Sequence, residues 1–235
     1  MHELDKLLRQ SIENYTLTGF YTALHAFCAV DLSAFYFDIR KDALYCDAAD
    51  SLRRRACRTV LDQLFSCLTA WLAPVLCFTA EEAWLERNPG DAASVHLRQF
   101  PAIPASWRNE ALGQKWAKLR TLRSVITGAL EVERREKRIG ASLQAHPDVW
   151  GVAPYREALQ GIDFAEVCIT SGISLHDGAA PVGQALFTLP EVEGVAVHAG
   201  GAPGAKCERC WRVLPEVGRD HPDLCHRCAD AVALA

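Results

Sequence analysis

The sequence predicts a mainly α-helical protein: a helical bundle, then a small α+β segment, then a C-terminal ribbon held by four cysteines. Three observations predict this architecture. Apolar residues recur at spacings of three and four through most of residues 1–138. After Gly140, glycine becomes frequent and short β-type runs replace the helical period, and two Cys-x-x-Cys pairs lie near the end. We therefore expect domains at 1–138, 139–205 and 206–235.

The first part is expected to contain several separate helices. Helical periods cover residues 4–12 and 18–37, and Thr18 is a good N-cap. Residues 41–50 look like a connection, and the next helix runs from Asp50 or Ser51 to a break at Pro74. Thr79, followed by Glu82, fits a capping box for one more short helix.

The longest predicted helix covers residues 109–138. One apolar stripe runs along it, formed by Leu112, Trp116, Leu119, Leu122, Ile126 and Leu130. Beyond it, runs rich in β-branched residues predict strands at 166–170 and 194–197.

Composition is that of an ordinary globular protein, with half of the residues apolar and 23% charged. No uninterrupted apolar run reaches the roughly 20 residues of a membrane span. The first six residues show no apolar targeting core, so we expect a cytoplasmic protein. Six scattered cysteines are interpreted as buried and reduced: Cys28, Cys46, Cys57, Cys67, Cys77 and Cys168.

The net charge of −4 conceals a strong local asymmetry. Residues 109–138 carry 8 basic and 4 acidic side chains, whereas residues 139–205 carry 1 basic and 7 acidic ones. Such a concentration of positive charge in an acidic chain indicates a surface for a phosphate backbone. A solvated helix face explains the same pattern, and charge alone does not decide between the two.

The two Cys-x-x-Cys pairs, Cys207 with Cys210 and Cys225 with Cys228, are separated by 14 residues. Each pair presents two thiolates to one ion, and four protein ligands leave no open position, which predicts one structural Zn²⁺. Disulfides, a redox-active pair and an iron–sulfur cluster are weaker interpretations. His221 or His226 could replace a cysteine as a ligand.

Basic and aromatic residues flank the cysteines. Arg209, Arg212 and Arg227 could pair with phosphate, and Trp211 could stack on an unpaired base. The alternative is that Trp211 covers the small core of the ribbon.

Three segments, in this order, resemble bacterial isoleucyl-tRNA synthetases. They are Cys28–Asp42, Glu136–Ala145, and the cysteine pairs with their neighbours at 206–211 and 225–228. The cysteine tail alone is shared with some DNA-repair glycosylases, so the combination carries the resemblance. It covers almost the whole chain.

The resemblance implies that the helical part is an anticodon-binding domain and that Cys207, Cys210, Cys225 and Cys228 hold zinc. The family's enzymes activate isoleucine with ATP and transfer it to tRNA. The family's His-Ile-Gly-His and Lys-Met-Ser-Lys-Ser type signatures are absent from these 235 residues, as is the editing domain. We therefore expect a chain that binds the tRNA for isoleucine but is inactive alone, with ATP and Mg²⁺ bound only through a catalytic part that is a candidate partner.

Ten residues are predicted to contact tRNA, either phosphates of the anticodon stem or bases of its loop: Arg53, Arg54, Arg58, Arg134, Arg135, Lys137, Arg138, Arg209, Trp211 and Arg212. Two alternatives remain open. A valine or leucine synthetase shares the helical domain and would differ in anticodon preference. A stand-alone zinc-ribbon protein that binds DNA or another protein would not prefer tRNA over duplex DNA.

Overall fold

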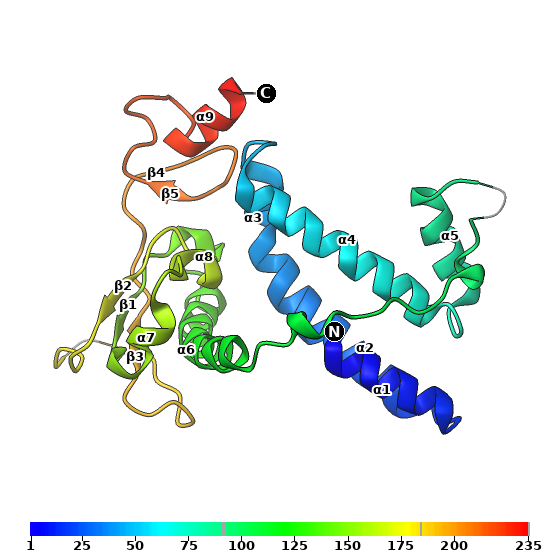
Figure 1. Cartoon of the computed structure of the whole chain (residues 1–235). Coiled ribbons are helices and arrows are strands. Elements are labelled where there is room, and N and C mark those ends of the chain that lie inside the picture. Colours follow the sequence, from blue (N-terminus) through cyan, green and yellow to red (C-terminus); the bar gives the residue numbers. More distant parts are fainter. Residues whose placement is uncertain (91–92, 184, 235) are drawn as a thin grey trace. The chain divides into compact units, whose positions relative to one another are not determined.

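A computed structural model describes residues 1–90, 93–183 and 185–234. It is mainly α-helical with a few short strands and a small four-cysteine ribbon near the C-terminus, as predicted (Figure 1). The chain divides into two compact units, Met1–Leu44 with Ala49–Arg108, and Tyr45–Ala48 with Asn109–Ala235. The domain boundaries at 138 and 205 stay predictions, and Ala235 lies outside the described residues.

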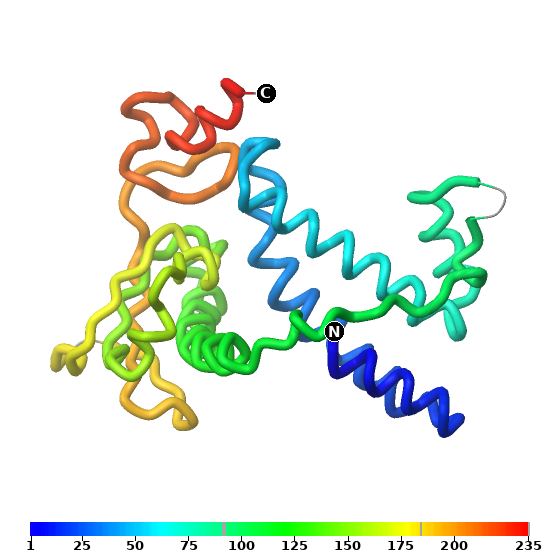
Figure 2. Tube along the Cα trace, in the orientation of Figure 1, coloured from blue at the N-terminus to red at the C-terminus, as the bar shows by residue number. Residues whose placement is uncertain are grey.

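The first unit is built on helices with one apolar face. α1 (His2–Glu13) and α2 (Thr18–Ala26) lie side by side (Figure 2). Their buried residues form a core with two residues of α4 (Leu52–Leu72), and its members are Leu4, Leu8, Phe20, Leu24, Cys67 and Trp71. The spacing of three and four in α1 produces this face, as the sequence predicted.

α2 continues without a break into η1 (Phe27–Phe37), a π-helical stretch, and into α3 (Asp38–Cys46). The connection expected at 41–50 is therefore wrong for residues 41–46. Ile39 and Ala43 are buried one turn apart, and Lys41 pairs with Asp38 at 2.9 Å, so the polar segment stays helical.

The resulting helix, Thr18–Cys46, has 29 residues and is by length and composition apolar enough to cross a membrane. This length was not expected, because the sequence suggested that the helix ends near residue 37. Only 17% of the most apolar window is buried, and one such helix near the N-terminus is weak evidence for a membrane span.

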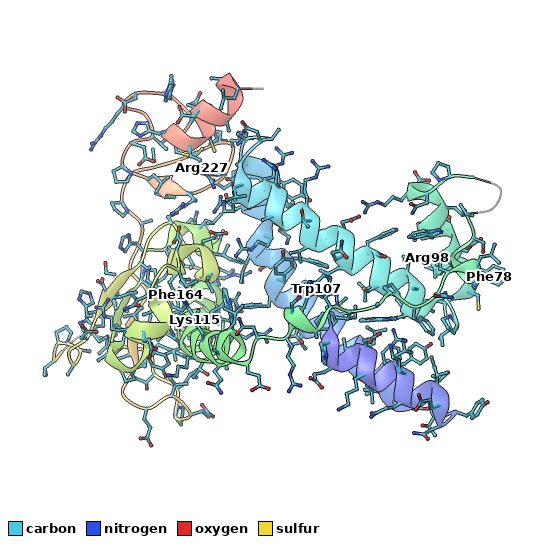
Figure 3. The ribbon with its side chains drawn as sticks, in the orientation of Figure 1. Phe78, Arg98, Trp107, Lys115, Phe164 and Arg227 are labelled. Carbon is cyan, nitrogen blue, oxygen red and sulfur yellow. The ribbon has the colours of Figure 1, made fainter. Side chains whose placement is uncertain are left out.

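α4 begins where predicted, because the Ser51 hydroxyl accepts a hydrogen bond from the Arg54 amide at 3.1 Å. α5 (Cys77–Arg87) begins before Thr79, so the expected capping box is wrong. Two short 3₁₀ turns follow, η2 (Val95–Leu97) and η3 (Ala105–Trp107). Arg98, labelled in Figure 3, ties this segment to α4 through the Ser66 hydroxyl at 2.8 Å.

The second unit contains the longest helix, α6 (Glu110–Arg135). The Asn109 side chain accepts a hydrogen bond from the Leu112 amide at 2.9 Å and fixes the start. The central part of the predicted stripe is buried, at Leu119, Leu122, Ile126 and Leu130. Leu112 is half exposed near the beginning of the helix.

The second unit also contains a three-stranded sheet of order β2-β1-β3, and α6 contacts its strand β3. β1 (Asp148–Trp150) pairs in parallel with β2 (Ser174–His176) and antiparallel with β3 (Ala196–His198). A short turn, η4 (Ser142–Gln144), precedes β1. Three short helical segments lie between β1 and β2: η5 (Ala153–Tyr155), α7 (Arg156–Leu159) and α8 (Phe164–Cys168). The strand expected at 194–197 is present, shifted to β3.

The strand expected at 166–170 is wrong, because this segment lies mostly in α8. Asp163 caps the helix by accepting a hydrogen bond from the Glu166 amide at 3.1 Å. Phe164 and Val167 are both buried, and α8 packs against α6. Capping and packing therefore override the β preference of Val167 and its neighbours. Burial raises the pKa of Cys168, beside them, to about 12, which keeps this thiol protonated and unreactive.

Candidate metal centre and nucleic-acid interface

The ribbon brings the two cysteine pairs to one point. Cys207 and Cys210 follow β4 (Ala205–Lys206), which pairs with β5 (Val213–Leu214). Cys225 is the N-cap of α9 (His226–Ala233), and Cys228 lies in its first turn. All four are buried, and their sulfur atoms lie within 4.8 Å of one another.

This spacing fits a tetrahedral metal site. With Zn–S bonds of about 2.3 Å, tetrahedral geometry separates two sulfur atoms by about 3.8 Å. The Cys210 and Cys225 sulfur atoms are 3.8 Å apart. A disulfide needs about 2.05 Å, and all four thiols are free. The donor set and the geometry therefore fit one Zn²⁺ bound by four thiolates.

The backbone around Cys207 favours a thiolate, whereas burial raises the pKa of Cys210. Burial tends to raise the pKa of Cys207, but backbone hydrogen bonds at Cys210, Cys225 and Arg209 outweigh it and lower that pKa to about 6. Burial raises the pKa of Cys225. Thiols that share so small a space lose their protons together only with a cation between them, as a zinc-bound set does.

Neither histidine joins this group. In the part of the chain that the structure describes, the set of metal-binding side chains around this point consists of the four cysteines. The exposed His226 ring pairs with the Asp220 carboxylate at 2.5 Å, with which it forms a hydrogen bond that raises the pKa of His226. The geometry therefore does not support the alternative in which a histidine replaces a cysteine.

Arg209 links the cysteine group to the residues that end α3. Its guanidinium donates to the carbonyl of Cys46 and, at 3.2 Å, to that of Tyr45. The same group lies 3.7 Å from the Cys228 sulfur atom. A hydrogen bond of this kind supports a metal ligand from outside the coordination sphere.

Three more flanking residues have different environments. Arg227, labelled in Figure 3, pairs with the buried carboxylate of Asp47 at 3.2 Å. Arg212 donates to the Ser171 carbonyl at 2.7 Å. Trp211, whose φ is 65°, is 61% exposed, so the interpretation that it covers the ribbon core is wrong.

The sequence did not suggest that residues 45–48 belong with the ribbon. Cys46 is buried against the four cysteines, yet it forms no part of the metal-binding set. Ser171 also contacts the ribbon, since its hydroxyl accepts a hydrogen bond from the Val213 amide at 2.7 Å. No spacing or motif connects positions so far apart in the chain, so only the fold reveals them.

In the first unit, the arginines at the start of α4 differ in their burial and in their ion pairs. Arg53 pairs with Asp42 at 3.2 Å, and Arg54 is half-buried. Arg55 and Arg58 are exposed one turn apart. Of the three predicted here, Arg58 is thus the most accessible to a phosphate.

In the second unit, the basic residues at the end of α6 are partly neutralised. Arg134 pairs with Glu131 at 3.3 Å, and Arg138 pairs with Glu133 at 2.5 Å and also with a second carboxylate. The hydrogen bond from Arg138 lowers the pKa of Glu133. Arg135 and Lys137 are exposed. The two basic groups lie in separate units, and their contacts with tRNA stay predictions.

Comparison with known families gives two matches. Residues 1–149 match the family described as the anticodon-binding domain of tRNA ligase. Residues 204–231, which contain all four clustered cysteines, match the zinc finger found in FPG and IleRS.

Curated relatives agree with both matches. The chain is 53% identical over 237 residues to an isoleucine–tRNA ligase of Agrobacterium fabrum. It is 51% identical to that of Brucella abortus over 235 residues and 52% identical to that of Ruegeria pomeroyi over 234. These alignments include 99–100% of this chain but 24% of each relative, so the chain spans about a quarter of their length. Because the first match covers more than half of its residues, the chain belongs to the family of anticodon-binding domains of tRNA ligases.

Proposed function

We propose that this chain binds the anticodon stem and loop of the tRNA for isoleucine, as part of a cytoplasmic isoleucine–tRNA ligase. The observation that carries the proposal is the match to the anticodon-binding family over residues 1–149. Relatives named isoleucine–tRNA ligase, which align with the whole of this chain, support it. Exposed arginines on α4 and basic residues at the end of α6 supply positive charge for phosphates.

The metal centre has a structural role in this proposal. Cys207, Cys210, Cys225 and Cys228 hold one Zn²⁺, which when bound joins four thiolates and leaves no position for substrate. β4, β5 and α9 are too short to form a core of their own, so metal binding supplies much of the ribbon's folding free energy. The ribbon in turn presents the exposed Trp211.

Activation of isoleucine is assigned to a part of the enzyme outside these residues. The nucleotide-binding signatures of the family do not occur in the sequence, so ATP and Mg²⁺ bind elsewhere and this chain alone does not charge tRNA. Its contribution is affinity and anticodon preference.

The test is a binding measurement on the zinc-loaded chain at one fixed salt concentration. The ligands are an isoleucine tRNA, the same tRNA with a valine anticodon, and duplex DNA of equal charge. Preference for the native anticodon supports the proposal. Preference for the valine anticodon points to another tRNA ligase, and equal binding to all three contradicts the proposal and favours a general nucleic-acid-binding ribbon.

A further inference from the structure

A groove of about 970 Å³ lies along one face of α4 in the first unit. Residues three or four positions apart share one side of a helix, and α4 lines the groove with such a set: Arg55, Arg58, Asp62 and Phe65. Phe37 contributes from the end of η1, and Arg87 contributes from the end of α5. Three elements therefore form the groove: α4, α5 and the π-helical stretch η1.

Charge in the groove favours an anion. Three guanidinium groups line it, against the single carboxylate of Asp62, which pairs with Arg87. Arg55 and Arg58 are exposed one turn apart on the same face. A guanidinium matches the geometry of a phosphate through two parallel N–H groups, so this pair suits a nucleic-acid backbone.

The aromatic residues of the groove have two different roles. Phe65 is fixed between neighbours: its ring stacks on that of Trp84 at 6.2 Å, and the Arg87 guanidinium lies 5.3 Å from its centre. Arg98 covers Trp84 at 3.7 Å, which completes a rigid column. Phe37 has an edge-type contact with the Tyr36 ring, with the centroids 6.1 Å apart, and is still 36% exposed, so part of its side chain is open to a ligand.

We propose that this groove binds one unpaired nucleotide of the anticodon loop, with its base stacked on Phe37 and its phosphate held by Arg55 and Arg58. The inference rests on the proposed function, since it names the groove in which that function reads the loop. The volume lies at the upper end of the roughly 300–1,000 Å³ typical of pockets for small molecules, which a single nucleotide fits. A base inside a duplex has no free face to stack, so the groove selects unpaired RNA.

An acidic peptide is the competing ligand. It would use the arginines in the same way but would gain little from an exposed aromatic ring. Stacking on Phe37 therefore distinguishes a nucleotide from a peptide, and the experiment is designed around that ring.

The experiment measures binding of the zinc-loaded chain to a synthetic anticodon stem-loop that carries 2-aminopurine at one loop position at a time. Stacking on an aromatic ring quenches the fluorescence of this base, so we expect quenching on binding at one loop position. Phe37→Leu keeps the apolar bulk and removes the ring; it should abolish that quenching and weaken binding about fivefold or more. Arg58→Gln should weaken binding while the quenching of the bound complex remains.

Lys6→Gln is the matched control, since Lys6 is an exposed cation on α1 outside the groove. It should change the affinity less than about twofold, because it removes the same charge without a phosphate contact. Circular dichroism melting curves should show that all three variants are folded.

Two results would overturn the inference and leave the proposed function intact. One is tight, anticodon-dependent binding with quenching unchanged in Phe37→Leu. The other is displacement of the stem-loop from the groove by polyglutamate as effectively as by unpaired RNA of equal charge. Failure of the unmodified chain to prefer its anticodon would instead refute the proposed function, and the groove assignment with it.

Discussion

Arg209 and Cys46 bind each other in both directions across 163 positions of the sequence. The Arg209 guanidinium donates to the Cys46 carbonyl, and the Cys46 thiol lies 3.7 Å from the Arg209 carbonyl, to which it donates. The same guanidinium reaches the Cys228 sulfur atom. Residues 45–48 are therefore attached to the metal centre by a short chain of polar contacts.

Removing the metal should destabilise both the ribbon and residues 45–48. Without a cation, four crowded thiolates repel one another or become protonated, and the ribbon loses its main source of stability. We expect hydrogen exchange after chelation to accelerate in residues 205–234 and also at 45–48. Amides in α1 and in the centre of α6 should exchange as before. Unchanged exchange at 45–48 would show that the turn holds its conformation independently of the metal.

Replacing Arg209 by lysine should weaken the attachment although the charge is kept. Lysine cannot reach two carbonyl groups and a sulfur atom at once, because its ammonium is a single point donor. Loss of these partly buried hydrogen bonds should cost about 1–3 kcal/mol in the unfolding of the ribbon. The rate at which zinc is released to a colorimetric chelator reports this loss of stability, and we expect the rate to rise. Arg219→Lys, at an exposed position of the ribbon, should release zinc at the original rate.

Gly151 is held in a conformation that only glycine tolerates easily. Its φ is +77°, and a Cβ atom would lie 1.8 Å from the Gly194 carbonyl oxygen. Gly151→Ala should therefore lower the free energy of unfolding by about 2–4 kcal/mol, measured by urea denaturation.

Gly113 provides the opposite case. It lies within α6 with open space around its Cα, so Gly113→Ala should stabilise the chain by about 0.5–1 kcal/mol. Equal effects of the two substitutions would contradict the close approach at Gly151.

The salt dependence of tRNA binding should show which basic residues at the end of α6 contact phosphates. Neutralising Arg135 and Lys137 together should reduce the slope of log affinity for tRNA against log salt by about 1.5, if each contacts one phosphate. Neutralising Arg134 and Arg138 should reduce it less, because nearby carboxylates already compensate their charges. An unchanged slope in the first variant would remove this end of α6 from the RNA surface.

Local signals predicted the parts of the fold that local interactions determine. The apolar residues at helical spacing from Leu112 to Leu130 were sufficient to locate α6. The four cysteines were found in the same way, since each pair is a tight turn whose spacing is readable in the sequence.

Errors arose where contacts between distant segments decide the structure. Residues 166–168 carry a β preference, yet capping and burial make them helical. Residues 41–46 look polar enough for a loop, but Ala43 is buried and keeps them in the helix. The attachment of Arg209 and Arg227 to residues 45–48 left no trace in spacing or composition, because its partners are more than 160 positions apart.

The pairing of Cys46 with Arg209 also sets an order of events during synthesis. A ribosome that adds about 5–20 residues per second needs roughly 8–33 seconds to add the 163 residues from Asp47 to Arg209. Throughout that interval the helix end at Cys46 and the carboxylate of Asp47 have no ribbon to cover them. The turn between α3 and α4 must therefore be among the last parts of the newly synthesised chain to form its native contacts.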